Sequence, residues 1–360
     1  MDSSGDPRSR DRFRGCLLGG AVGDAIGAPI EFMSIRTIRR HFGPDGVTGF
    51  VGDAWPAGSI TDDTQMSLWT AEGLIRAQGR GATKGVVDIP TMVRHAYLRW
   101  FETQDPSTLR RAASGDPVLS GWLLTEPVLH ARRAPGNTCL GALRDDRFGT
   151  IAEPLNDSKG CGSVMRAAPV GLASDDPFEL SCGIGALTHG HPSGYLSAGA
   201  FAVVIAELRR DAGLDAGIEA ARRALQPYAA SGWEVLAALD AVARLVDEVR
   251  PDDPSTAADA VERLGAGWVA DEALAIALYC ASVAASPMEA ILMAANHSGD
   301  SDSTAAVCGN LVGVQHGTGW IPDEVLSGLE ARALIERVAD DLHDVFVLGG
   351  AVDLDRYPPT

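Results

Sequence analysis

Residues 15–31 read GCLLGGAVGDAIGAPIE, an apolar stretch in which small residues recur at helical spacing. Gly19, Gly23 and Gly27 fall four residues apart on one face of an α-helix, so a second helix can approach that face closely. Glycine repeats also mark dinucleotide-binding sites, but this spacing is not GxGxxG and no strand precedes it. The stretch therefore predicts tight helix packing and argues against a dinucleotide-binding fold.

The rest of the chain carries the same helical pattern. Apolar or alanine-rich stripes recur at helical spacing, whereas strand-like alternation bounded by turn residues is hard to find. We therefore expect one all-α domain over residues 11–351, with a disordered segment at 1–10 and a frayed tail at 352–360. The predicted helices cover residues 11–28, 64–78, 88–102, 194–211, 215–229, 231–248, 271–284, 287–296 and 303–316.

Composition narrows the class of protein. A net charge of −18 argues against sequence-independent binding of nucleic acid, although a modified nucleic-acid end could still be recognised locally. Six cysteines without a CxxC pair indicate reduced thiols. The polar N-terminus lacks the apolar core of a signal peptide, and no stretch reaches about 18 uninterrupted apolar residues. These features predict a cytoplasmic protein that does not associate with membranes.

Two segments far apart in the sequence resemble acidic helix starts. They are SITDDT at residues 59–64 and GDSDST at residues 299–304, each followed by a helical pattern. Ser, Thr and Asp are common helix caps, and capping is the ordinary explanation for such clusters. A cap needs only one side-chain oxygen, however, and each segment offers two acids and at least two hydroxyls. The surplus of oxygen atoms is more than capping requires and suits a metal site.

The chemistry of that site depends on whether the two helix starts meet. If they do, four carboxylates share one small space, and they must be protonated or neutralised by cations. Hard oxygen ligands with no neighbouring His or Cys favour Mg²⁺ or Mn²⁺ over Zn²⁺, and two ions would suit four carboxylates. Glu31, beyond Pro29, is either an exposed loop acid or a further contributor.

Three other motifs are ambiguous by themselves. SKGCGSVMR at residues 158–166 is a glycine-rich turn whose amides could hold a phosphate, but it lacks the Gly-Lys-Ser/Thr of a P-loop. THGHPSGY at residues 188–195 is either a helix-opening turn or a ligand-binding turn, and its His-x-His pattern is a poor zinc signal. Trp268 is either a core residue or a stacking partner for a base. Cys161 has no evident partner that would make it a nucleophile.

Six segments together resemble the ADP-ribosylglycohydrolase family, which includes dinitrogenase reductase-activating glycohydrolases and arginine- and serine-specific ADP-ribosylhydrolases. They are GCLLGGAVGDAIGAPIE, GSITDDTQMSLWTAEGL, NDSKGCGSVMRAAPVGL, LTHGHPSGYLSAG, GWVADEALAIALYC and NHSGDSDSTAAVCGNLVG. They follow the family's order and span residues 15–313. The resemblance implies a compact orthogonal helical bundle with a central cleft that holds two Mg²⁺ ions.

The resemblance also implies roles for individual residues. The implied metal ligands are Thr61, Asp62, Asp63, Asp300, Asp302 and Ser303. Glu31 matches the family's flexible-loop glutamate, and the catalytic proton could be handled by Glu31, Asp62 or Asp63. The implied contacts to ADP-ribose come from Asn137, Thr138, Gly160, Cys161, Gly162, Ser163, His189, Gly194, Tyr195, Trp268 and Ser301.

The implied reaction is hydrolysis at C1″ of the distal ribose, which releases ADP-ribose from a modified protein. We expect the enzyme to be a monomer. Asp-Ser-Asp-Ser and His-Pro-Ser-Gly-Tyr resemble the arginine-directed branch, whereas the serine-directed branch more often shows Asp-Thr-Asp-Thr. The alternatives are another linkage (to serine, a nucleic-acid base or a small molecule), a two-metal phosphohydrolase, or a non-catalytic ADP-ribose-binding protein.

Overall fold

The protein is described by a computed structural model that covers residues 7–104, 116–248 and 259–360. Over these ranges it contains no β-strand, and one isolated bridge joins Gly160 to Val269. The all-α prediction is therefore confirmed. The helices are α1 (Pro7–Gly27), α2 (Ile35–Phe42), α3 (Asp62–Lys84), α4 (Ile89–Gln104), α6 (Asn137–Arg144), α7 (Ala168–Ala173), α8 (Phe178–Ala186), α9 (Pro192–Arg209), α10 (Leu214–Leu225), α11 (Trp233–Glu248), α13 (Ala270–Val283), α14 (Pro287–Ala295), α15 (Ser301–His316), α16 (Asp323–Gly328) and α17 (Arg332–Phe346).

Short 3₁₀ turns connect several of these helices. They are η2 (Ala28–Ile30), η3 (Trp122–Thr125), η4 (Pro127–His130), η5 (Cys161–Ser163), η6 (Gln226–Tyr228) and η7 (Glu262–Leu264). Each of the nine predicted helical ranges overlaps a described helix. The predicted ranges left out α17, whose apolar residues do recur at helical spacing, and five short helices of six to nine residues: α2, α6, α7, α8 and α16.

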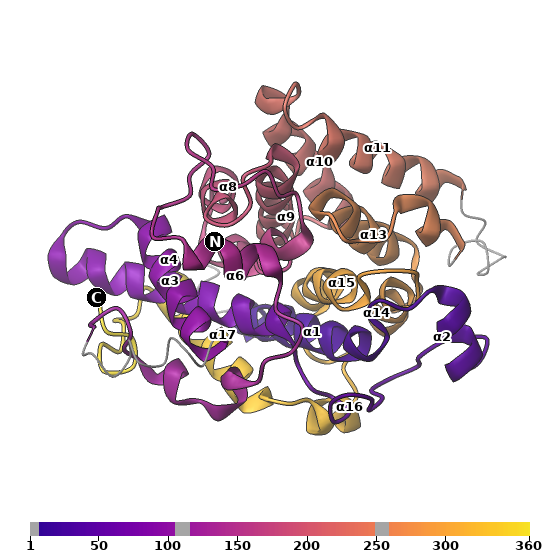
Figure 1. The fold of residues 1–360 in the computed structure, drawn as a ribbon, viewed down its shortest axis with the longest axis horizontal. Helices are drawn as coiled ribbons and strands as arrows, with labels where there is room; N and C mark the ends of the chain where they lie inside the picture. The colour runs from indigo at the N-terminus through magenta and orange to yellow at the C-terminus, as the bar shows by residue number, and fades with distance from the viewer. Residues whose placement is uncertain (1–6, 105–115, 249–258) are drawn as a thin grey trace.

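Helices α1 and α15 lie side by side at the centre of the bundle (Figure 1). Their glycine faces touch: a Cβ at Gly23 would lie 2.0 Å from the carbonyl oxygen of Ala305, and one at Gly27 would lie 2.3 Å from that of Ser301. The pairing shows that the helices are antiparallel, so the end of α1 meets the start of α15. No single described helix is long and apolar enough to span a membrane; the bent pair Ser9–Ile30 and Ile35–Phe42 meets that test by length and composition only.

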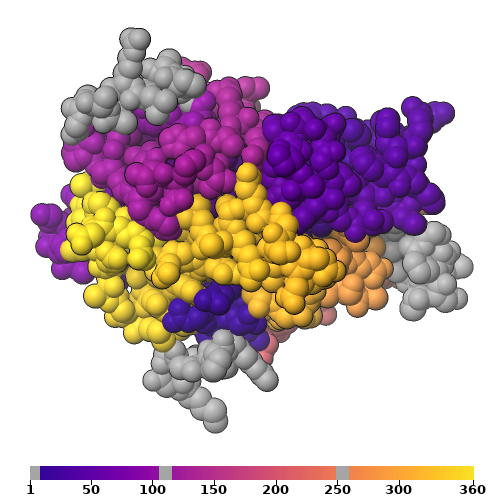
Figure 2. Space-filling view, turned by 90° about the horizontal axis from the view of Figure 1, so that it is seen from below, coloured from indigo at the N-terminus to yellow at the C-terminus, as the bar shows by residue number. Residues whose placement is uncertain are grey.

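The described residues at each end of the chain contact the rest of the fold. Residues 7–10 form the first turn of α1, while residues 1–6 lie outside the described ranges. At the other end, Tyr357 is 1% exposed, and its hydroxyl donates to Asp341 at 2.8 Å. In Figure 2 the C-terminal segment, in yellow, packs against the body of the molecule. A buried tyrosine therefore anchors the segment over 352–360 that the sequence predicts to be a frayed tail.

Candidate active site

The two acidic helix starts meet in one cleft. Asp62 and Asp63 open α3, and Asp300 and Asp302 flank the start of α15; all four line a cleft of about 300 Å³. Glu31 joins them because α1 ends beside the start of α15, and the amide of the next residue donates to the carbonyl of Gly299 at 3.2 Å. Carboxylate oxygens of Glu31, Asp300 and Asp302 lie within 4.8 Å of one another.

Asp24 on α1 organises the start of α3, and sequence reasoning did not assign it a role. Its carboxylate accepts hydrogen bonds from the Thr61 hydroxyl at 2.8 Å and from the amides of Thr61 and Thr64 at 2.9 and 3.1 Å. These amides belong to the first turn of a helix and have no partner within it. Burial, with repulsion from Asp302, raises the pKa of Asp24 to about 7. Asp24 therefore caps α3 from a neighbouring helix.

The crowded carboxylates favour a cation. Burial is the main cause that raises the pKa of Asp62, Asp63 and Asp300 well above the usual range, and the charge of Asp302 adds to it. The same two effects raise the pKa of Glu31 to about 10. One oxygen of Asp63 is buried with no hydrogen-bond partner among the described residues. A hard divalent cation would stabilise the ionised carboxylates and satisfy such an oxygen, so the donor set fits a metal.

The walls of the cleft are joined through their backbones. The amide of Cys161 donates to the carbonyl of Trp268 at 3.2 Å, and the amide of Ala270 donates to that of Lys159 at 2.8 Å. These bonds place the glycine-rich loop and Trp268 on the same side of the cleft. The Trp268 ring stacks on Phe32, with centroids 5.0 Å apart and an interplanar angle of 24°.

Sequence reasoning did not identify Phe32. This residue has a φ of 68° and is 70% exposed, both unusual for a large aromatic residue outside a binding site. Neither its backbone conformation nor its exposure can be recognised from the residue type, because both depend on contacts that follow α1. It lines the cleft beside Glu31.

The structure brings only part of the predicted ligand-binding set to the cleft. Asn137, Thr138, Gly160, Cys161, Gly162, His189 and Trp268 line it, as does the predicted metal ligand Ser303. Residues predicted to bind but placed outside the lining are Thr61, Ser163, Gly194, Tyr195 and Ser301. Ser163 donates its hydroxyl proton to the carbonyl of Gly194 at 2.7 Å, so this pair ties the loop to α9. Thr61 instead donates to Asp24.

Cys161 is a hydrogen-bond donor in this cleft. Its Sγ lies 2.7 Å from Oδ2 of Asp300 and 3.6 Å from the hydroxyl of Ser303. Burial and the neighbouring charge of Asp300 raise the pKa of the thiol well above its ordinary value. A thiol kept protonated in this way is a poor nucleophile, which argues against covalent catalysis by Cys161.

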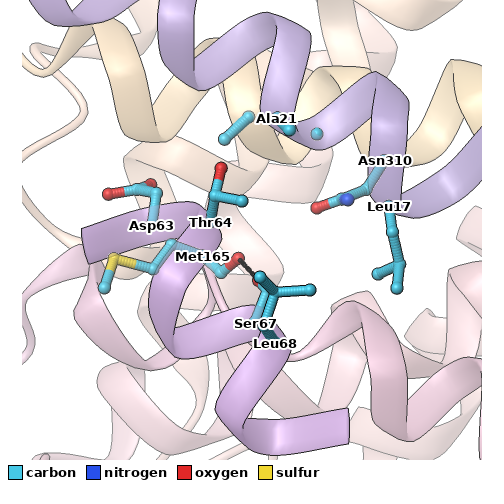
Figure 3. A pocket seen from close by; sticks show the side chains of 10 residues that line it. Leu17, Ala21, Asp63, Thr64, Ser67, Leu68, Met165 and Asn310 are labelled. Carbon is cyan, nitrogen blue, oxygen red and sulfur yellow. Dashed lines mark hydrogen bonds between the residues drawn. The ribbon is translucent and has the colours of Figure 1, made fainter. Parts of the chain in front are cut away.

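A smaller void lies beneath the carboxylates, between α1, α3 and α15. Figure 3 shows its walls, with Asp63 and Thr64 at one end, Asn310 at the other, and Ser67 donating to the carbonyl of Met165. Its volume is about 10 Å³, which is the space of about one water molecule. It is therefore too small for a nucleotide, and substrate binding belongs to the larger cleft.

His189 should remain neutral, and this has a measurable consequence. Burial and the nearby charge of Arg166 lower its pKa to about 3, and its Nδ1 lies 2.8 Å from the Thr188 hydroxyl. Between that value and the unfolded pKa of about 6.5 the unfolded chain binds the proton and the folded chain does not, so stability falls as pH falls. At about pH 5.5 this costs roughly 1.4 kcal/mol.

Urea unfolding of the unsubstituted protein and of His189→Gln at two pH values measures this cost. We expect the unsubstituted protein to lose about 1.4 kcal/mol more than the variant between about pH 7.5 and pH 5.5. Equal losses in both proteins would contradict a lowered histidine pKa.

The comparisons with known proteins agree over nearly the whole chain. A family model described as ADP-ribosylglycohydrolase matches residues 5–351. The ADP-ribosyl-dinitrogen reductase glycohydrolase of Rhodospirillum rubrum is 27% identical, covering 91% of this chain and 92% of that protein. The ADP-ribosylarginine hydrolase Tri1 of Pseudomonas putida is 25% identical, covering 93% and 78%. A solved structure of an ADP-ribosylglycohydrolase-related protein complex has a TM-score of 0.62 and 25% identity, covering 93% and 98%.

Proposed function

Because this chain belongs to the ADP-ribosylglycohydrolase family, we propose that it hydrolyses the bond at C1″ of the distal ribose and releases ADP-ribose, with magnesium as cofactor and arginine as the modified residue. Family membership establishes the broader activity, hydrolysis of glycosidic ADP-ribose linkages. The arginine assignment is supported by the Asp-Ser-Asp-Ser segment at residues 300–303 and by the arginine-directed relative from Pseudomonas putida.

One observation carries the proposal. Glu31, Asp300 and Asp302 converge with two aspartates of α3 in a cleft whose walls hold a glycine-rich loop and a stacked aromatic pair. The acids suit metal-assisted chemistry, the loop suits a diphosphate, and the aromatic pair suits an adenine ring. ADP-ribose contains all of the groups that these features would recognise.

The metal would be held by the two helix starts. Asp62 and Asp63 would contribute ligands from α3. Asp300, Asp302 and Ser303 would contribute ligands from the start of α15. These donor groups are numerous enough for two Mg²⁺ ions. Bound Mg²⁺ supplies Lewis acidity and a template for substrate oxygens. The unpartnered oxygen of Asp63 is the feature that best fits such a ligand role.

The side chains of the cleft would stabilise the positive charge that develops on the ribose and would transfer one proton from water to the leaving group. Positive charge develops on the ribose ring as the bond from C1″ to the guanidine nitrogen breaks, and the carboxylates beside it stabilise that charge. The oxygen of a water molecule bonds to C1″, and one proton passes to Glu31 and then to the departing nitrogen. We assign the transfer to Glu31 because it is half-buried at the cleft edge, whereas Asp62 and Asp63 are 5% and 3% exposed.

A panel of defined linkages tests this proposal. With Mg²⁺ present, we expect an ADP-ribosyl-arginine peptide to be cleaved at least about 10-fold faster than an ADP-ribosyl-serine peptide, a difference of about 1.4 kcal/mol in the barrier. Chromatography should show free ADP-ribose as the product, and chelation of the metal should stop its release.

Two outcomes would favour other functions. Release of AMP in place of ADP-ribose would indicate a two-metal phosphohydrolase. Tight binding of ADP-ribose without turnover of any linkage would indicate a non-catalytic binding protein. Faster cleavage of serine-linked or base-linked ADP-ribose would leave the reaction intact and would contradict only the choice of arginine.

A further inference from the structure

A second cavity adjoins the cleft, which we call the side cavity. Its volume is about 190 Å³, and it shares Glu31, Phe32 and Ala134 with the cleft. Its outer wall is the loop before α3, which contributes Asp53 and Trp55. These three shared residues therefore form the boundary between two adjoining spaces.

The loop that carries Asp53 and Trp55 is held in place by a hydrogen bond within the loop and by hydrogen bonds to Glu330. Within the loop, the amide of Asp53 donates to the carbonyl of Trp55 at 3.1 Å, which closes a tight turn. Further along, the carbonyl of Gly58 accepts from the amide of Glu330 at 3.0 Å, and the amide of Ile60 donates to the Glu330 carboxylate at 3.0 Å. Hydrogen bonds therefore fix the wall of the side cavity to the rest of the protein.

The position of the side cavity relative to the acids suggests what occupies it. Under the proposed function, on which this inference rests, C1″ lies beside Glu31 and Asp302, and the ADP-ribose extends along the cleft toward Trp268. The bond that breaks joins C1″ to the acceptor, so the acceptor must extend from C1″ in the direction away from the rest of the ADP-ribose. The side cavity, across Glu31 from the cleft, is the space into which the acceptor would extend.

The lining of the side cavity suits a planar cation on an apolar stem. Glu31 and Asp53 supply carboxylates, Phe32 and Trp55 supply aromatic rings, and Met33 supplies apolar surface. No Lys or Arg occurs among the described residues of the lining, and no described residue forms an ion pair or hydrogen bond with the Asp53 carboxylate. Carboxylates bind guanidinium through paired hydrogen bonds, and tryptophan attracts it through the ring face.

We propose that the side cavity receives the acceptor side chain of the substrate and that Asp53 and Trp55 select a guanidinium there. Asp53 would pair with the guanidinium, and Trp55, which is half-buried, would cover its planar face. An uncharged acceptor such as a serine side chain is too short and too polar to use either contact. These two residues thus determine acceptor specificity without taking part in bond cleavage.

The test uses Asp53→Asn and Trp55→Ala in the full chain with Mg²⁺. We expect each to raise KM for an ADP-ribosyl-arginine peptide by about 10-fold, while kcat/KM for an ADP-ribosyl-serine peptide stays within about 2-fold. Trp55→Phe, which keeps an aromatic face, should recover most of the loss. A second measurement needs no turnover: calorimetric titration of agmatine into ADP-ribose-saturated protein should show a Kd raised by about 10-fold in both variants.

Matched controls separate this effect from general damage. Asp45→Asn removes the same charge from an exposed position earlier in the same loop, and Trp233→Ala removes a tryptophan that is 63% exposed; neither residue lines the cleft or the side cavity. If Asp53→Asn and Trp55→Ala match these controls on both peptides and in agmatine binding, the assignment is overturned while the proposed function stands. If the unsubstituted protein releases no ADP-ribose from any linkage of the panel, both are overturned.

Discussion

Asp302→Asn should lower kcat/KM for ADP-ribosyl-arginine by about 10²- to 10³-fold and should make the metal-free protein more stable. Asp302 is the acid that most of the others repel: its charge contributes to the raised pKa of Asp24, Glu31, Asp62, Asp63 and Asp300. Asparagine has nearly the same shape but carries no charge, so the substitution relieves the repulsion and at the same time removes a proposed metal ligand. Loss of activity with a gain in stability is an unusual combination for a core substitution.

Thermal unfolding with and without Mg²⁺ measures both parts. The unsubstituted protein should be stabilised by about 2.7 kcal/mol at roughly 100 times the Kd for the ion, and Asp302→Asn should lose most of this gain. Asp146→Asn, at an exposed position, is the control and should behave as the unsubstituted protein. Full Mg²⁺-dependent turnover by Asp302→Asn would refute the proposed site, and unchanged Mg²⁺ stabilisation would show that the remaining acids hold the ion.

The sequence predicted the parts of the site that depend on local composition. A surplus of acids and hydroxyls at two helix starts is visible in residues 59–64 and 299–304, and the structure places both in one cleft. The major helices were predictable for the same reason, since apolar periodicity is a local property. Periodicity could not predict that the two helix starts meet, because their meeting depends on the packing of α1 against α15.

The residues that sequence reasoning missed act across space. Asp24 carried one overlooked signal, because it is the one charged residue within the stretch 15–30, and charged residues are seldom fully buried unless they are paired. Asp53 and Trp55 carried none, because an acid and an aromatic in a glycine-rich loop are ordinary surface residues. Their importance arises from the boundary that Glu31 and Phe32 form between the cleft and the side cavity. Such a boundary is a product of tertiary structure alone.

The glycine face of α1 determines whether the two halves of the site can meet at all. Gly23→Ala should lower the free energy of unfolding by about 2–3 kcal/mol, because the added Cβ would lie 2.0 Å from the carbonyl oxygen of Ala305 and 2.8 Å from the next amide nitrogen. Both are backbone atoms, so α15 must move as a whole and cannot yield by rotating a side chain. That movement would separate Glu31 from Asp300, and kcat/KM should fall with stability.

Gly141→Ala is the matched control, since it places the same methyl group on a helix where nothing lies within 4 Å. Alanine favours the helix by about 1 kcal/mol over glycine, so this variant should be more stable than the unsubstituted protein, while Gly23→Ala loses stability despite the same helical advantage. Urea unfolding measures the difference, which we expect to be about 3–4 kcal/mol between the two variants. If the two substitutions change stability equally, the close contact of α1 and α15 does not constrain the fold, and the site must be assembled by other contacts.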